Sequence, residues 1–349
     1  MDLECSFLGK NAIVGKIKGK NKGKTILLRA DIDALPIMED TGLSYSCKSG
    51  NMHACGHDMH TAMLLGAAEV LSSVRDGISG SIVLLFQPAE EILSGAKMCI
   101  QNGILEAVDM AMTVHVMTGS DLPTGNVLLS YDNPCAPSAD FFEITVFGKG
   151  CHGSSPSIGV DPITCACRIV TCLEHIKAYE IGIHDKAVLT IGEIRGGNSA
   201  NAIPDCVTMR GTLRCFDEKT REFYKERLID VSKGIASSFR CSCEIKYTFS
   251  CPSLINNPEL LEKTKENLTE LLGKENVITI KDTKSNLQGS EDFAYISQKV
   301  PSVSVAIVAG SIKVGYTYPL HNPRVTFDED ALTVGCSVFS YNAIRLLNQ

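Results

Sequence analysis

Residues 51–60, NMHACGHDMH, hold three of the eight histidines of the chain together with a cysteine and an aspartate. Cys55 and His57 are two positions apart, and side chains at this spacing in an extended segment point to the same side. Because a thiolate and an imidazole are typical metal ligands, the pair predicts part of a metal site. A buried thiol and a core histidine would explain the two residues separately. We expect His53 and His60 to cap or pack around the turn.

Three further potential ligands lie near the ends of predicted strands. Glu91 and His115 are at the ends of the apolar runs 81–91 and 109–116, and His321 follows another apolar run. The carboxyl ends of parallel strands meet at one edge of a sheet, so these side chains can converge with the Cys-His pair. One thiolate, three imidazoles and one carboxylate exceed the four donors of a structural zinc site. This excess indicates two divalent metal ions that share a ligand, for which the thiolate is the candidate.

Two carboxylates beside these ligands can act without binding metal. Glu90 precedes Glu91, and of two adjacent carboxylates one can ligate while the other moves a proton between an activated water and a leaving amine. Asp33 can accept the second ring N–H of a ligating histidine, which we expect to be His57. The alternatives are a solvated glutamate pair and a turn or helix cap at Asp33.

Strands and helices alternate in the first part of the chain, which predicts an α/β fold with a mostly parallel sheet. Asp58 is the expected N-cap of the first helix, and the lysine-rich residues 16–24 are expected to form a solvated hairpin between two strands. The expected strands are 25–33, 81–91 and 109–116, and the expected helices are 58–74 and 94–103.

The pattern changes after residues 133–138, NPCAPS, to the βαββαβ order of a ferredoxin-like unit. Its expected strands are 140–148, 186–194, 206–216 and 241–249, and its helices are 161–179 and 218–238. Helices 257–273, 290–300 and 328–348 and a strand at 302–310 then resume the first architecture. We therefore expect a catalytic α/β domain of residues 1–136 and 250–349, interrupted by a ferredoxin-like α+β domain of residues 137–249.

The bulk composition excludes several classes of protein. With 44% apolar and 21% charged residues and no apolar run of about 20 residues, the chain is expected to be globular and not to span a membrane. A formal charge of −7 gives no basic surface for nucleic acid. The start of the chain lacks a secretory signal pattern, and the 15 cysteines are odd in number and scattered, which favours reduced thiols in a cytoplasmic protein.

Eight motifs, in order along the chain, resemble those of the M20 metallopeptidase family. They are RADIDALPI, MHACGHDMHTAMLLGAA, LFQPAEE, GCHGSSPSIGVDPI, NAIPD, GTLR, GSEDFAY and HNPRVTFDEDAL. The resemblance is to the aminoacylase and amidohydrolase branch, which includes hippurate hydrolases, N-acyl-amino-acid amidohydrolases, N-acetyldiaminopimelate deacetylases and auxin-conjugate hydrolases. It runs from about Ile13 to the C-terminus. Members of this family normally have several tens of residues, including a helix that packs on the catalytic sheet, before the segment that corresponds to VGKIKGK.

The resemblance implies roles for individual residues. It makes Glu90 the general base and His152 a lid histidine that reaches the active site of the partner subunit and stabilises the oxyanion. Asn201 and Arg214 are implied to hold the carbonyl oxygen or carboxylate of the substrate, although Arg214 can equally be a surface residue of a strand. The implied metal ligands are those already gathered from the sequence: Cys55, His57, Glu91, His115 and His321.

We therefore expect a hydrolase of N-acyl amino acids that uses two divalent metal ions, with zinc or manganese favoured and cobalt or nickel also suited to the donors. The resemblance implies a homodimer formed through the lid domain. A dipeptidase or carboxypeptidase would perform the same reaction on a different acyl group. A non-catalytic metal-binding homologue and, more distantly, a thiol-redox protein are the remaining alternatives.

Overall fold

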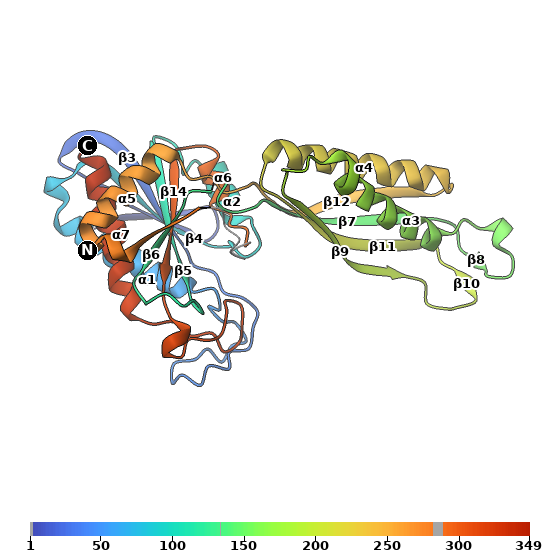
Figure 1. Cartoon of the computed structure of the whole chain (residues 1–349), viewed down its shortest axis with the longest axis horizontal. Coiled ribbons are helices and arrows are strands. Elements are labelled where there is room, and N and C mark those ends of the chain that lie inside the picture. Colours follow the sequence, from blue (N-terminus) through green and yellow to red (C-terminus); the bar gives the residue numbers. More distant parts are fainter. Residues whose placement is uncertain (1–2, 133, 282–288) are drawn as a thin grey trace. The chain divides into compact units, whose positions relative to one another are not determined.

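The computed structural model describes residues 3–132, 134–281 and 289–349, which form two compact units. The first comprises the described residues of Met1–Cys135, Leu254–Leu287 and Glu291–Gln349, and the second comprises those of Ala136–Ser253 and Gln288–Ser290. Figure 1 shows the elements of both units.

The first unit is built on a mixed eight-stranded sheet with the order β1-β2-β4-β3-β5-β14-β6-β13. The central pairs β4-β3, β3-β5 and β5-β14 are parallel, as is β6-β13, and the remaining pairs are antiparallel. The short strands β1, β6 and β13 were not predicted from the sequence. The strands are β1 Glu4–Leu8, β2 Ala12–Lys18, β3 Asn21–Asp31, β4 Ser79–Gln87, β5 Met110–Met117, β6 Val127–Ser130, β13 Val277–Ile280 and β14 Ser302–Val308.

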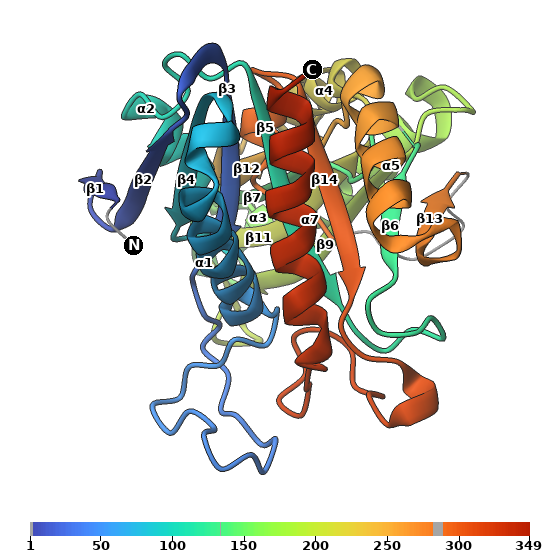
Figure 2. The same ribbon diagram turned by 90° about the vertical axis from the view of Figure 1, so that its left-hand side faces the viewer.

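Helices cover both faces of this sheet, as expected for parallel strands that are buried on both sides. On one face, in front of the sheet in Figure 2, lie α1 (His57–Ser73), α5 (Pro258–Leu272) and α7 (Asp330–Leu347). The short helices α2 (Gly95–Gln101) and α6 (Ala294–Ser297) lie on the other face. The sequence predicts a helix at 290–300, but the structure has the single helical turn α6 within this range. None of the helices among the described residues is long and apolar enough to span a bilayer.

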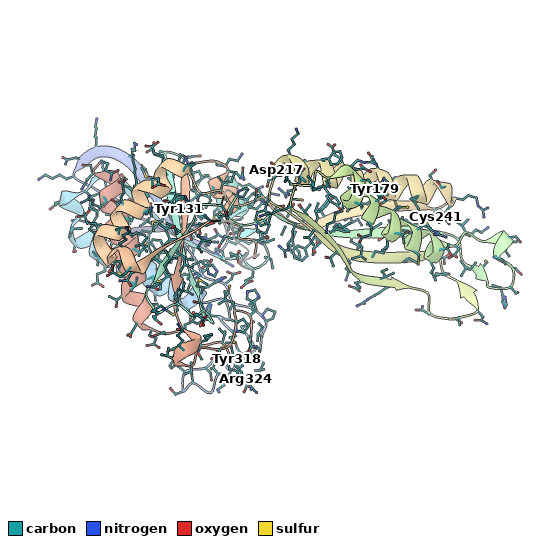
Figure 3. The ribbon with its side chains drawn as sticks, in the orientation of Figure 1. Tyr131, Tyr179, Asp217, Cys241, Tyr318 and Arg324 are labelled. Atoms are coloured by element: carbon teal, nitrogen blue, oxygen red, sulfur yellow. The ribbon has the colours of Figure 1, made fainter. Side chains whose placement is uncertain are left out.

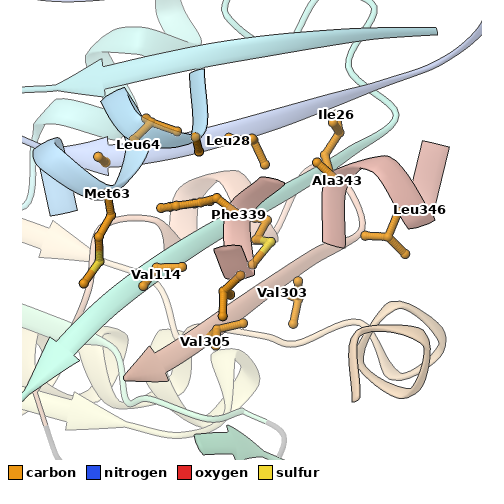
Figure 4. Packing of buried hydrophobic residues seen from close by; sticks show 14 of the residues in the cluster. Ile26, Leu28, Met63, Leu64, Val114, Val303, Val305, Phe339, Ala343 and Leu346 are labelled. Carbon is orange, nitrogen blue, oxygen red and sulfur yellow. The ribbon is translucent and has the colours of Figure 1, made fainter. Parts of the chain in front are cut away.

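The core of the first unit lies between the sheet and helices α1 and α7. Figure 4 shows Met63 of α1, Val114 of β5, Val305 of β14 and Phe339 of α7 gathered there, and all four are buried. Each such side chain contributes roughly 1.5–3 kcal/mol when it is fully removed from water. Gly335 of α7 faces the Met63 side chain at a distance that leaves no room for a Cβ atom, so this glycine permits the close approach of α7 to α1.

Two sequence predictions in the first unit were wrong. Residues 16–24 do not form a hairpin, because β4 lies between β2 and β3 and pairs with both. The helix α1 begins at His57 and its N-cap is Gly56, with φ 84°, whereas Asp58 lies in the first turn. A left-handed backbone at Gly56 suits glycine and allows the ligand-bearing loop to enter the helix at His57.

The second unit has the predicted βαββαβ order. Its antiparallel sheet has the order β12-β7-β11-β9, and Figure 1 shows both helices on one face. Asp161 and Asp217 cap the two helices by accepting backbone N–H groups, and Asp217 is labelled in Figure 3. The elements are β7 Ala139–Phe147, α3 Pro162–His175, β9 Ala187–Gly196, β11 Cys206–Cys215, α4 Glu218–Ser238 and β12 Ser242–Cys251.

Small elements complete the fold. The strands β8 (Cys151–His152) and β10 (Ala202–Ile203) form a two-stranded antiparallel ribbon in the second unit. Within the part of the chain that the structure describes, five single turns are 3-10 or π-helical: Arg75–Gly77, Pro156–Ile158, Ile176–Glu180, Lys274–Asn276 and Ile312–Val314. All 15 cysteines lie within the described residues, where none forms a disulfide bond.

Candidate metal centre

The first unit brings together the five residues that the sequence predicts as metal ligands. Their ligand atoms form two groups of three, and within each group all atoms lie within 4.8 Å of one another. Both groups contain Cys55: one adds His57 and His115, and the other adds Glu91 and His321. The arrangement therefore has the form of two adjacent metal positions with the thiolate of Cys55 at the shared corner.

Asp33 orients two of these residues. The Nδ1 atom of His57 lies 3.1 Å from Asp33 Oδ1, and the backbone N–H of Glu91 donates to Asp33 Oδ2 at 3.0 Å. A proton on Nδ1 leaves the lone pair of His57 Nε2 available as a ligand. His57 Nε2 and Glu91 Oε1 are both buried without a hydrogen-bond partner, and they lie 3.9 Å apart. A bound cation would take both of these buried atoms as ligands and so satisfy them.

His115 has a ring nitrogen available to bind a metal, whereas His60 does not. The Nδ1–H of His115 donates to the carbonyl of Val116 at 2.7 Å, which leaves Nε2 as an acceptor 3.6 Å from the Cys55 sulfur. His60 has both nitrogens engaged, because Nδ1 lies 2.5 Å from Asp31 Oδ1 and Nε2 accepts the N–H of Val116. His60 therefore packs beside the site, as its sequence position predicted. The Nδ1 atom of His53 is buried without a hydrogen-bond partner.

Two residues with left-handed backbones hold the loops of the site. Ala89, with φ 62°, immediately precedes Glu90 and Glu91 in the loop after β4. His321, with φ 66°, lies in the loop after β14 and donates its backbone N–H to Ala54 at 2.8 Å. Non-glycine residues rarely adopt this region, and such strain is concentrated at functional sites. Figure 3 marks this second loop by Tyr318 and Arg324, and Arg324 ties it to Asp40 at 2.7 Å.

The electrostatics of the ligand atoms reflect burial among carboxylates. Burial alone would lower the pKa of His57, but Asp31 and Asp33 outweigh it and raise the pKa to about 9. Burial, with Glu91 and Glu90 adding repulsion, raises the pKa of the Cys55 thiol well above its usual range. In the metal-free protein both side chains therefore hold their protons at neutral pH. A divalent cation would displace those protons and compensate the negative charge.

Glu90 is buried next to the ligands. Its Oε1 accepts the backbone N–H of Asp292 at 3.3 Å, and its carboxylate lies close to His57 and Glu91. Burial, followed by repulsion from Glu291 and Asp292, raises its pKa well above the ordinary glutamate value. A carboxylate with a raised pKa is a stronger base, which suits a group that moves protons.

A buried ionic network behind the site was not anticipated from the sequence. Arg29 is 1% exposed and pairs with Asp31 at 2.7 Å and with Asp292 at 2.8 Å. Gln87 joins them by accepting from Arg29 and donating to Asp292. The sequence does indicate buried charges in RAD (residues 29–31) and SED (residues 290–292), where charged residues lie in or beside apolar runs. Buried charges need partners of opposite charge. The network links the strand ends that carry the ligands.

The predicted lid residues lie in the second unit. His152 of β8 is exposed and pairs with Ala202 of β10, directly after Asn201. The carbonyl of Asn201 accepts the N–H of Gly153 at 2.7 Å, so His152 and Asn201 are neighbours. Arg214 does not join them: it precedes the last residue of β11 and donates to Ser290 at 2.6 Å.

The donors present fit a pair of divalent metal ions, because the five convergent ligands form two adjacent groups that share the Cys55 thiolate. Each group also contains one buried atom without a hydrogen-bond partner, His57 Nε2 or Glu91 Oε1. The potential ligands lie beyond the ends of parallel strands, and a βαββαβ unit is inserted into the chain that forms the sheet. Together these two features define a two-domain metallohydrolase. Residues 27–344 match the model of peptidase family M20/M25/M40, and the chain belongs to this family.

Two curated relatives and one solved structure match nearly the whole chain. Thermostable carboxypeptidase 1 of Saccharolobus solfataricus is 37% identical over 342 residues, covering 97% of this chain and 84% of the relative. N-acetylcysteine deacetylase of Bacillus subtilis is 36% identical over 339 residues, covering 97% and 86%. The crystal structure of the YXEP protein of Bacillus subtilis, a dinuclear metal binding peptidase of the M20 family, superposes with a TM-score of 0.81 at 34% identity, covering 99% of this chain and 88% of that one.

Proposed function

We propose that this protein is a metal-dependent amidohydrolase that cleaves the amide bond of N-acyl amino acids, releasing a carboxylic acid and a free amino acid. The observation that carries the proposal is the pair of ligand groups that share Cys55, with buried Glu90 beside them. The relative named N-acetylcysteine deacetylase supports an N-acyl amino acid as the substrate class.

The proposed cofactor is a pair of divalent metal ions held by Cys55, His57, Glu91, His115 and His321. The thiolate and imidazoles favour zinc, whereas the carboxylate also suits manganese, cobalt or nickel, with zinc or manganese preferred. When bound, such ions polarise the acyl carbonyl and lower the pKa of a water molecule. Asp33 acts through His57 by fixing its tautomer and through the backbone of Glu91 by fixing its position.

Side chains of the protein carry out the proton transfers, stabilise the oxyanion and bind the substrate. Glu90 accepts the proton of the attacking water and later donates it to the leaving amine. His152 donates a ring N–H to the developing oxyanion, in the active site of the partner subunit. Asn201 lies beside His152 and holds the same carbonyl oxygen. Arg214 binds the carboxylate of the substrate, because its planar fork donates two parallel hydrogen bonds.

We also propose that the protein is a homodimer formed through the second unit. The edge strand β9 supports this proposal. Val188 is 50% exposed and Ile194 is 52% exposed on this strand, which among the described residues pairs only with β11. Unpaired strand edges with apolar side chains are typical sites of association. A lysine at Ile194 is expected to convert the dimer to a monomer in light scattering, and an unchanged mass would contradict the proposed interface.

A panel of substrates tests the proposed function. The metal-depleted protein is reloaded with zinc or manganese and incubated with N-acetyl, N-benzoyl and indole-acyl amino acids and with dipeptides, and released amino acids are identified by mass spectrometry. Metal-dependent release from the N-acyl compounds is expected. Release from peptides alone would instead favour a dipeptidase or carboxypeptidase, a reading that the 37% identical carboxypeptidase relative supports. No release by a folded, metal-loaded protein would indicate a non-catalytic metal-binding protein.

A further inference from the structure

The imidazole of His152 is held by the residue two positions further along the chain. The backbone N–H of Ser154 donates to His152 Nδ1 at 3.2 Å, and Ser154 Oγ lies 2.8 Å from the same nitrogen. A backbone N–H can only donate, so the lone pair of Nδ1 faces it and the proton of the neutral ring lies on Nε2. The hydroxyl of Ser154, which can rotate, then donates to Nδ1 as well.

The backbone around this contact is fixed on both sides. The N–H of Ser155 donates to the carbonyl of His152 at 2.8 Å, which closes a tight turn. The N–H of Gly153 donates to the carbonyl of Asn201 at 2.7 Å, and a Cβ at Gly153 would lie 2.9 Å from that oxygen. The ribbon of β8 and β10 thus sets the backbone, and Ser154 sets the ring. The exposed Nε2–H is the atom left to contact another molecule.

We propose that Ser154 is a positioning residue that holds His152 in the Nε2–H tautomer, so that the ring presents a hydrogen-bond donor to the substrate's carbonyl oxygen as negative charge develops on it. This inference rests on the proposed function for the identity of the acceptor, but the tautomer itself does not depend on catalysis. In the opposite tautomer Nε2 would carry a lone pair, and it would repel an oxyanion. Fixing the tautomer before the reaction avoids a reorganisation at the moment of charge development.

Kinetics of a double-mutant cycle test the role of Ser154. The variant Ser154→Ala removes the hydroxyl 2.8 Å from Nδ1 but keeps the longer backbone N–H contact at 3.2 Å. Loss of the hydroxyl is expected to lower kcat about tenfold with little change in KM, because the interaction that depends on the tautomer is made mainly in the transition state. Ser154→Thr, which keeps a hydroxyl, is expected to restore most of the rate. Ser155→Ala is the matched control, since the backbone N–H of Ser155 closes the turn and the substitution retains it.

In a His152→Ala background Ser154→Ala is expected to have no further effect, because the two residues act as one unit. Equal losses of kcat in both backgrounds, or no loss in the wild type, would overturn the proposal.

A spectroscopic measurement separates this inference from the proposed function. With 15N-labelled histidine in the full chain, the resonances of His152 are assigned by their loss in His152→Gln. At a pH where the ring is neutral, the wild type is expected to show an unprotonated Nδ1 and a protonated Nε2, and Ser154→Ala is expected to show a larger share of the other tautomer. A wild-type ring that carries its proton on Nδ1 would refute the inference. The correct tautomer in a protein that hydrolyses none of the substrates would refute only the proposed function.

Discussion

Asp33 and His57 form a carboxylate-imidazole pair whose Oδ1 and Nδ1 atoms are 3.1 Å apart, while the other oxygen of Asp33 accepts the backbone N–H of Glu91. One carboxylate therefore orients a residue from each of the two ligand groups. Burial alone would raise the pKa of Asp33, but the interactions with His57 and the hydrogen bond from the Glu91 backbone together outweigh it and lower the pKa, so this carboxylate is charged at neutral pH. Because it contacts His57 of one ligand group and Glu91 of the other, Asp33 is a structural link between the two proposed metal positions.

Removal of this link is expected to weaken metal binding without unfolding the protein. Loss of such a partner typically costs 10–100-fold in metal affinity, so Asp33→Ala is expected to lower the affinity by roughly that factor. Competition with a chelator measures the change. Asp76→Ala is the control, because Asp76 is an exposed aspartate of the same unit in the turn that follows α1, at the other end of that helix from His57. Equal affinities in both variants would show that Asp33 does not support the ligands.

Metal binding is expected to release about two protons at pH 7, one from Cys55 and one from His57, because both are protonated in the metal-free protein. A raised pKa means that the proton competes with the metal, so the affinity rises with pH. The rise becomes less steep above about pH 9, where His57 has lost its proton and only the Cys55 thiol still competes. Calorimetry in buffers of different ionisation enthalpy counts the protons. Cys55→Ala is expected to release one proton fewer. Cys47→Ala, a control at a half-buried loop cysteine outside the ligand groups, is expected to match the wild type. An affinity independent of pH would contradict this assignment.

Much of this site could be predicted from the sequence, because the ligands lie at positions that the alternating strands and helices place at one sheet edge. Cys55 and His57 are close in sequence, and Glu91 and His115 follow readable apolar runs. The number of donors predicts a ligand shared by two metal ions, and Cys55 belongs to both groups of ligand atoms. The strand order of the sheet edge was not predicted, since β2 and β3 are close in sequence but separated in space by β4.

The buried network could not be predicted because it joins residues more than 200 positions apart. Arg29 and Asp292 come from opposite ends of the chain, and neither position marks its partner in the sequence. The tautomer of His152 depends on a turn whose backbone N–H directions are set by tertiary pairing with β10. Short strands such as β13 are stabilised by their neighbours, and four residues give too weak a pattern to be recognised.

Arg29 is expected to be important for stability. It is fully buried among Asp31, Glu291 and Asp292, so Arg29→Leu leaves buried carboxylates without a cation. Removing one partner of a buried ion pair typically costs about 3–5 kcal/mol, and a loss of that size in the free energy of unfolding is expected from urea denaturation. Arg324→Leu removes an exposed arginine of the same unit and is expected to change the stability little. A loss no larger than in this control would contradict the importance of the network.

His60 is expected to make the metal-free protein sensitive to acid. Burial lowers the pKa of its ring to about 4, below the value of about 6.5 for an unfolded histidine. The unfolded chain then takes up the proton first, so the stability contributed by the neutral ring is complete above pH 6.5 and is lost as the pH falls toward 4. The difference corresponds to roughly 3 kcal/mol.

The variant His60→Gln isolates this contribution, because glutamine can still donate to Asp31 and accept from Val116. Unfolding free energies of the metal-free wild type and the variant are compared from pH 7 to pH 4. The wild type is expected to lose more stability than the variant over this range. Parallel curves would show that the ring of His60 titrates normally.

The most direct test of the central claim compares the wild type with Glu90→Gln after both have been loaded with the same metal. Glutamine keeps the size of the side chain but cannot take up the proton of the attacking water, so kcat for release of the amino acid is expected to fall by at least about 10²-fold. Metal content, measured by mass spectrometry, is expected to stay at two ions per chain in both proteins. A variant that keeps its metals and hydrolyses N-acyl amino acids at the wild-type rate would contradict the assignment of Glu90 as the base and with it the proposed mechanism.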